Sequence, residues 1–212
     1  MVNPGFEASG TPGWPGYIQP APISGWTATG NYGVNVSGPG PFANNGSNPE
    51  QDRVAFLQGE ATLTQTVWEL EDGEAYHLSF SFNARGGNKP TLNVTVNGET
   101  ALEYEVNPVG DAEPYYVYVY NFTADSDVAE ITFAQTAAGD NTVLLDDVRL
   151  VKGVYLEPAE IAHTHPQAIS DAYAACAEQL LGLNLVQPEI SRPKLWDIDE
   201  KRSCNECKRS GD

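Results

Sequence analysis

The chain has 212 residues and a formal net charge of −18 at pH 7. Residues 1–151 contain nineteen of the twenty-nine acidic residues but only four of the eleven Lys and Arg residues. A domain this acidic repels phosphate backbones and anionic lipid surfaces, which excludes nucleic acid and membranes as its partners. No apolar run approaches the ~20 residues that span a bilayer, and the opening Met1-Val2-Asn3 shows no signal peptide.

Residues 8–50 are rich in Pro and Gly, which predicts loops rather than helices or long central strands. Trp26 precedes an alternating stretch, so we expect it in the core. Trp14 and Tyr17, flanked by Pro and Gly, and Tyr32 are candidate sugar platforms, because the apolar face of a pyranose ring stacks on an aromatic ring. The alternative is that these aromatic side chains only cap the edge of the domain.

Short β-prone segments follow one another from residue 53 onward, as in an all-β sandwich. The dipeptide Asn97-Gly98 is the strongest hairpin signal among them. The segments are Arg53–Gln58 and Ala61–Leu70, separated by Gly59-Glu60, then Tyr76–Phe82, Leu92–Val96, Leu102–Val106, Tyr115–Phe122, Ile131–Phe133 and Val143–Val151. We predict about nine or ten strands in two packed antiparallel sheets.

One of these segments has a polar second face. His77, Ser79, Ser81, Asn83 and Arg85 alternate with apolar residues, and this pattern predicts hydroxyl, amide and guanidinium groups across one sheet. Asn83 and Arg85 are candidate ligands for sugar hydroxyls, and Arg85 stands out because basic residues are scarce. A solvated sheet face without any ligand explains the same pattern.

The last predicted strand, NTVLLDDVRL at residues 141–150, contains an acid at an apolar position. At period 2, Leu144, Asp146 and Val148 share one face, so Asp146 points inward if that face is the core face. A buried, unpaired carboxylate costs several kcal/mol and must meet a donor network or a cation. Glu7, which follows the expected core residue Phe6, is a matching acid near the start of the chain.

The motifs of residues 2–151 resemble, in their order and spacing, the galactose-binding-like jelly rolls. The motifs are NPGFE at residues 3–7, Trp26 in SGWTATG, then FLQG, LTQTV, YHLSFSFNAR and the closing LLDDVRL. That superfamily includes calcium-containing carbohydrate-binding modules of secreted glycosidases and a related family of cell-wall proteins of unknown function. The resemblance implies a two-sheet antiparallel jelly-roll sandwich over residues 1–151, and it indicates the fold far better than the ligand.

The resemblance also implies a structural calcium ion. In the superfamily, the glutamate of the opening motif and the first aspartate of the closing motif hold this ion, which carries over to Glu7 and Asp146. Asp52 is a further candidate, because calcium prefers hard oxygen ligands. The alternative is that Glu7 and Asp146 only accept backbone N–H hydrogen bonds.

Residues 152–212 form a C-terminal extension of different character. The periodicity predicts a single helix at Gln167–Leu183, followed by a linker or disordered end at Lys194–Asp212.

All three cysteines lie in this extension: Cys176, Cys204 and Cys207. The spacing of Cys204 and Cys207 suits a disulfide or a zinc ion, with His163 and His165 as further zinc ligands, and Cys176 is a disulfide candidate.

No nucleophile, base and orienting group that can converge is recognisable, so we expect no enzyme. The sequence predicts a non-catalytic carbohydrate-binding or cell-surface adhesion module whose partner is a polysaccharide. Abundant Gly and Pro, four Asn-X-Ser/Thr sequons and scarce Lys favour a secreted, extracellular protein in its mature form over a cytosolic one. The alternative is a structural subunit of an extracellular assembly, in which the tail docks on another copy or an adjacent domain.

Overall fold

The computed structural model describes residues 1–10, 12–36 and 40–155. Its regular elements are β1 (Tyr17–Ile18), β2 (Thr27–Val36), the 3-10 turn η1 (Gly40–Phe42), β3 (Arg53–Trp68), β4 (Ala75–Ala84), β5 (Thr91–Val96), β6 (Glu99–Glu105), β7 (Tyr116–Thr123), β8 (Val128–Gln135) and β9 (Thr142–Lys152). The nine strands confirm the all-β prediction. Within the described ranges, no helix is long and apolar enough to cross a membrane. The predicted helix and the tail cysteines and histidines lie outside the described residues.

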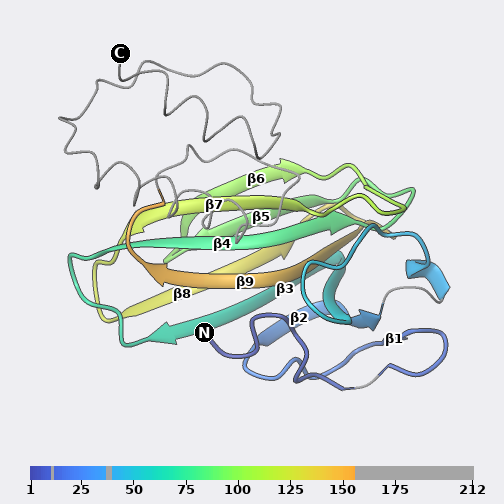
Figure 1. The fold of residues 1–212 in the computed structure, drawn as a ribbon, viewed down its shortest axis with the longest axis horizontal. Helices are drawn as coiled ribbons and strands as arrows, with labels where there is room; N and C mark the ends of the chain where they lie inside the picture. Colours follow the sequence, from blue (N-terminus) through green and yellow to red (C-terminus); the bar gives the residue numbers. More distant parts are fainter. Residues whose placement is uncertain (11, 37–39, 156–212) are drawn as a thin grey trace, which may run out of the picture. The chain divides into compact units, whose positions relative to one another are not determined.

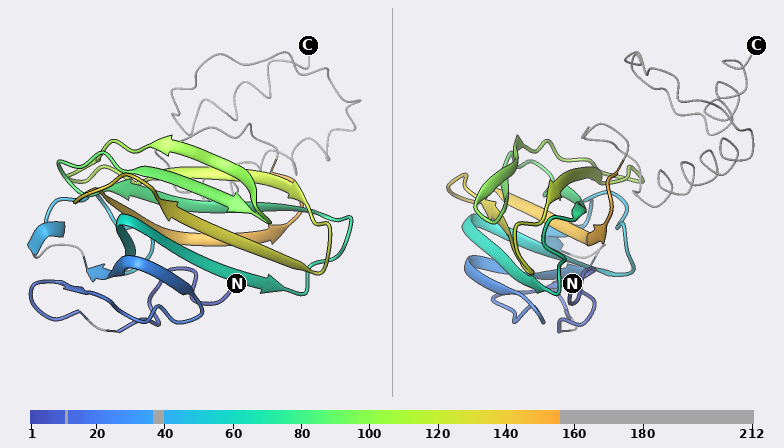
Figure 2. Two further views of the ribbon diagram at one scale, coloured as in Figure 1. Left: turned by 180° about the vertical axis from the view of Figure 1, so that it is seen from behind. Right: turned by 90° about the vertical axis from the view of Figure 1, so that its left-hand side faces the viewer.

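The strands form two antiparallel layers that are joined along one side. Their order is β6-β5-β8-β3-β9-β4-β7, with β2 paired to β3 and β1 paired to β2. The long strand β3 belongs to both layers, because its half Ala61–Trp68 pairs with β8 and its half Ala55–Gln58 pairs with β9. Figure 1 shows the strands along their length, and Figure 2 shows the two layers from the end. This arrangement confirms the two-sheet jelly-roll sandwich.

Strand β3 is continuous across the dipeptide Gly59-Glu60, so the predicted break at this dipeptide is wrong. The neighbouring strand β2, which pairs with β3, shifts register at Gly30. A Cβ atom at Gly30 would collide with the carbonyl oxygen of Glu60. Gly30 and Gly59 both have positive φ angles, 76° and 62°. Such angles cost glycine little, so the two strands pass from one layer to the other without ending.

The expectation of loops throughout residues 8–50 also needs correction. Strand β2 is ten residues long and pairs with β3 from Thr27 to Val36. The reason is local composition: prolines occur on both sides of this segment but not within it, so every residue of β2 keeps the N–H group that a ladder requires.

The main core lies between the two layers. Phe80 and Phe133 meet edge to face with their ring centroids 5.0 Å apart. Trp26 is 9% exposed and packs against Phe6 and Phe133, which confirms its predicted place in the core. These aromatic side chains and the aliphatic side chains around them bury the apolar surface that stabilises the sandwich.

A second, smaller core lies on the other face of the layer that contains β9. It consists of Phe42, Val54, Phe56, Tyr115 and Leu144. The turn η1 supplies Phe42, whose ring lies 5.2 Å from that of Phe56. The loop after η1 therefore covers this face of the sheet, and the buried acid Asp146 lies on the same face.

Candidate functional site

A bulge in β9 decides which way the acids of the closing motif point. In the pairing of β4 with β9, Ser79 faces Arg149 but Ser81 faces Asp146, so β9 holds one extra residue between them. Asp147 has a φ of 50° at this point. Such an extra residue reverses the alternation of side chains along the strand.

The bulge corrects the predicted face of β9. Leu145 and Val148 point into the main core, whereas Leu144 belongs to the second core. Asp146 therefore does not share a face with Val148. Asp146 lies on the face of β9 that points away from the main core, beneath the loop that precedes β3.

Asp146 is completely buried, and backbone N–H groups are its donors. Its Oδ2 accepts a hydrogen bond from Glu50 N at 2.9 Å, and its Oδ1 accepts one from Asp147 N at 2.8 Å. Burial raises the pKa of Asp146 to about 8, since desolvation outweighs these two hydrogen bonds and the carboxylates of Asp147 and Glu50 add repulsion.

Glu7 holds the neighbouring part of the same loop. Its Oε1 accepts hydrogen bonds from Asp52 N at 2.9 Å and Arg53 N at 2.7 Å, and the Arg53 guanidinium pairs with its carboxylate at 3.2 Å. Pro4 O accepts a hydrogen bond from Val148 N at 3.1 Å. The opening segment and the last strand therefore both contact residues 50–53.

The calcium site stays a prediction. In the part of the chain that the structure describes, no three His, Cys, Asp or Glu side chains are grouped as metal ligands. Glu7 and Asp146 are engaged by N–H donors, and Asp52 is exposed. Their carboxylates are nevertheless hard oxygen ligands of the kind that calcium prefers.

The polar face predicted on β4 is not an open surface. Ser79, Ser81 and Asn83 are buried. The Nδ2 of Asn83 donates to Asn45 O at 2.7 Å and Val109 O at 3.0 Å, while its Oδ1 accepts from Ala84 N and Val109 N. These bonds use the hydrogen-bonding capacity of the amide, so Asn83 holds two loops rather than presenting its amide to a ligand.

Arg85 is engaged as well. Its guanidinium pairs with the carboxylate of Asp140 and lies 3.4 Å from the Asp140 carbonyl oxygen. This ion pair gives Arg85 a structural role, because it ties the end of β4 to the loop before β9.

The three aromatic candidates lie in different environments. Trp14 is 91% exposed. Tyr17 is half-buried and meets the rings of Phe42 and Phe56 edge to face at 5.8 and 6.1 Å, so it supports the second core. Tyr32 lines a groove of appreciable size.

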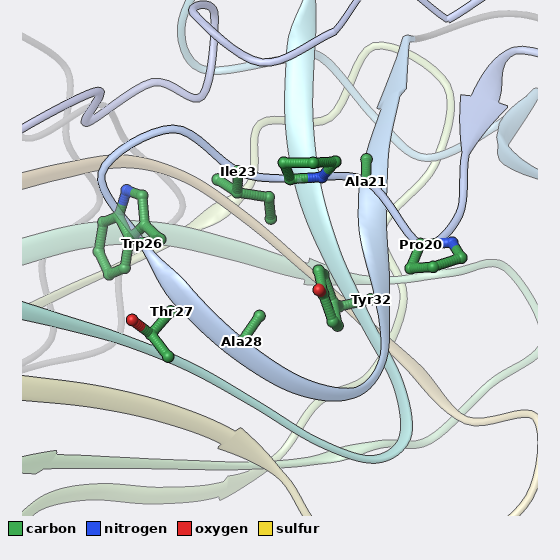
Figure 3. A pocket seen from close by; sticks show the side chains of 8 residues that line it. Pro20, Ala21, Ile23, Trp26, Thr27, Ala28 and Tyr32 are labelled. Atoms are coloured by element: carbon green, nitrogen blue, oxygen red, sulfur yellow. The ribbon is translucent and has the colours of Figure 1, made fainter.

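This groove lies between β2 and the segment before it, and we call it the Tyr32 groove. It has a volume of about 430 Å³ and is lined by Pro20, Ala21, Pro22, Ile23, Trp26, Thr27, Ala28 and Tyr32. Figure 3 shows Tyr32 and Ala28 on the curved strand, with Ala21 and Ile23 facing them from the preceding segment. Its size falls within the roughly 300–1,000 Å³ of small-molecule sites, and its lining is mostly apolar with two hydroxyl groups.

A second hollow is smaller. It has a volume of about 170 Å³ and lies between the residue 47–49 loop and β7, where Ser81, Tyr115 and Val117 line it. This volume is below the roughly 300 Å³ at which small-molecule sites begin, so the Tyr32 groove is the better candidate.

Sequence reasoning missed most of the groove. Tyr32 was a candidate, but Pro20, Ala21 and Ile23 resembled ordinary loop residues. Trp68 was missed as well: it is 66% exposed at the end of β3. Gln65 and Val67 lie on the inner face of β3. Trp68 follows Val67 directly, so the period of two along the strand was the signal that its indole points outward.

A comparison with known structures finds similar chains at low sequence identity. A cyclase from Fischerella sp. TAU, in complex with 4-(1H-indol-3-yl)butan-2-one, is 22% identical with a TM-score of 0.54, over 76% of this chain and 97% of the cyclase. TmCBM61 in complex with β-1,4-galactotriose is 20% identical with a TM-score of 0.45, over 72% and 97% of the two chains. The CBM22-1 xylan-binding domain of Paenibacillus barcinonensis Xyn10C is 17% identical with a TM-score of 0.41, over 60% and 85%.

The similarity to the cyclase shows the fold alone. No curated protein matches the chain. A family model does match, and it covers residues 1–151, from the opening motif through the bulged last strand. The chain therefore belongs to the family described as protein of unknown function, DUF642.

Proposed function

We propose that residues 1–151 form a non-catalytic, extracellular module that binds polysaccharide, with the Tyr32 groove as its contact site. The observation that carries this proposal is the groove itself, which is a preformed apolar hollow with a half-exposed tyrosine ring. Sugar rings suit such a lining, because their C–H faces stack on aromatic and proline rings while their hydroxyl groups need a few donors and acceptors.

Two of the residues that line the groove carry hydroxyl groups, Thr27 and Tyr32. Thr27 pairs with the outward-pointing Thr64, whereas Tyr32 pairs with the core residue Leu57, so the two side chains lie on opposite faces of β2. Stacking on Tyr32 then supplies most of the affinity, and the Tyr32 hydroxyl group orients the sugar. The remaining lining is apolar and contributes contact area without a nucleophile or a general base.

Calorimetry against a panel of neutral and acidic glycans tests the proposal. We expect a neutral glycan to bind the wild-type protein and to be recovered without cleavage. Tyr32→Ala should weaken binding at least about tenfold, the loss of one aromatic stacking contact, whereas Tyr32→Phe should retain most of the affinity. Thermal melts of both variants confirm that they are folded.

Trp14→Ala is the informative comparison. Trp14 is the most exposed aromatic side chain among the described residues, yet it does not line the groove. Loss of binding in Trp14→Ala with full binding in Tyr32→Ala would move the site away from the groove. A folded protein that binds no glycan would refute the proposal and leave the extracellular assembly, which mass photometry tests.

A further inference from the structure

The outer face of the layer that contains β5 and β8 carries a row of threonines in register across four strands. Thr27 on β2 pairs with Thr64 on β3, Thr64 pairs with Thr132 on β8, and Thr132 pairs with Thr95 on β5. We call these four residues the threonine row. Neighbouring strands lie about 4.8 Å apart, so the row extends about 14 Å across the sheet.

The side chains of the row point outward. On β3 the inward neighbours Leu63 and Gln65 are buried, whereas Thr64 is partly exposed. On β8 the same alternation buries Ile131 and Phe133 and leaves Thr132 partly exposed. The row therefore presents hydroxyl and methyl groups to the outside of the sandwich.

The hydroxyl groups of the row are held in place. The Oγ1 atoms of Thr64 and Thr132 lie 2.9 Å apart, and in the next row those of Thr29 and Thr62 lie 2.6 Å apart. Threonine is also stiff about χ1, because its Cβ is branched. A ligand that binds here gains hydrogen bonds with little loss of side-chain entropy.

The charges around the row favour a neutral ligand. The row contains no charged residue, and Glu130 lies two residues from Thr132 on the same face of β8. The four basic residues of the domain pair with carboxylates: Arg53 with Glu7, Arg85 with Asp140, Lys89 with Glu105 and Arg149 with Asp147. An anionic polymer would meet acids without a free counter-charge.

One further observation connects the row with the Tyr32 groove. Thr27 points outward in the row and is also one of the residues that line the groove, so the two surfaces meet at this residue. Trp68, which exposes 66% of its surface, lies on the same face of β3 but four residues, roughly 13 Å, from Thr64 along the strand. A chain that crosses the strands at the row therefore does not reach the indole of Trp68.

We propose that a neutral polysaccharide chain leaves the Tyr32 groove at Thr27 and lies across the threonine row, perpendicular to the strands. The inference rests on the proposed function and adds to it the class of ligand, an extended uncharged chain. It implies that affinity rises with chain length beyond the sugars that the groove holds. It also implies that acidic polysaccharides bind much more weakly than neutral ones.

The test combines a chain-length series with Thr64→Val/Thr132→Val. Valine keeps the branched shape and the β-propensity of threonine but removes the hydroxyl group. The probes are neutral β-linked glucan, xylan, mannan and galactan oligosaccharides of increasing length with their parent polymers, and polygalacturonate as the acidic contrast. Calorimetry supplies Kd for the oligosaccharides, and affinity electrophoresis compares the polymers.

We expect the double variant to bind short oligosaccharides like the wild type and the long chains at least about tenfold more weakly, the effect of losing two hydrogen bonds. Thr123→Val, at the exposed end of β7, is the matched control and should change neither. Equal affinity of the wild type and the double variant for long chains overturns the inference. A wild type that binds short and long chains equally also overturns it, and leaves the groove standing. A wild type that binds no glycan overturns both proposals.

Discussion

Asp146 should make the metal-free protein less stable as the pH rises. Its pKa is about 8 in the folded protein, whereas an unperturbed aspartic acid side chain, which represents the unfolded chain, has a pKa of 3.8. Between pH 3.8 and about pH 8, the folded protein therefore keeps the proton of Asp146, whereas the unfolded chain has lost it. Linkage requires the free energy of unfolding to fall as the pH rises through this window and to level off above pH 8.

The size of the effect follows from the two pKa values. Each unit of difference corresponds to about 1.4 kcal/mol, so between pH 5 and pH 9 the contribution of Asp146 falls by about 4 kcal/mol. That is a large share of the roughly 5–15 kcal/mol by which domains are stable. Repulsion from the carboxylates of Asp147 and Glu50 adds to the effect of burial.

Urea unfolding in the presence of a chelator measures this contribution. The wild type and Asp146→Asn are compared at pH 5 and pH 9, because the asparagine does not titrate and all other groups are common to both. We expect the stability of the wild type to fall relative to the variant by about 4 kcal/mol over this range. Parallel pH profiles of the two proteins would refute the reasoning.

Three further predictions address calcium, the amide of Asn83 and the tail. Glu7 and Asp146 are the predicted ligands of a structural calcium ion, so a chelator should lower the midpoint of thermal unfolding by ~5–10 °C and calcium should restore it. Asp146→Ala should abolish this response. A midpoint that does not change with chelator would contradict the site. Asn83→Ala should cost about 2–4 kcal/mol in urea unfolding, because it leaves buried backbone groups without partners. Asn121→Ala, which removes two exposed bonds to Tyr155, should cost less than about 1 kcal/mol, and equal costs would argue against the role of Asn83. If the tail cysteines form a disulfide or a zinc site, thiol titration of the native protein should find fewer than three free thiols, and a reductant or chelator should raise that number.

Local features of the sandwich could be predicted from neighbouring residues alone. Alternation between Tyr76 and Phe82 predicted a strand, and β4 covers that segment. Asn97-Gly98 predicted a two-residue hairpin, and these two residues join β5 to β6 with φ angles of 50° and 83°. Such signals suffice because they depend on the backbone preferences of neighbouring residues.

Some local patterns were misleading because contacts from elsewhere in the chain override them. The period of β9 predicted one face for Asp146 and Val148, but the bulge at Asp147 separates them. The polar side of β4 resembled a solvated face, but Asn83 is buried where it binds the residue 45 and residue 109 loops. The physical reason is that a loop which covers a sheet face leaves no periodic signal in the strand beneath it.

The groove and the threonine row depend entirely on tertiary structure. Tyr32 was visible as an aromatic residue in a loop-rich segment, but only the curvature of β2 places it opposite Ala21. Thr27, Thr64, Thr95 and Thr132 lie far apart in the sequence, and only the registers of three strand pairs bring them into one line. Alternation along a strand determines which face a side chain is on, whereas the pairing of distant strands determines which side chains it stands beside.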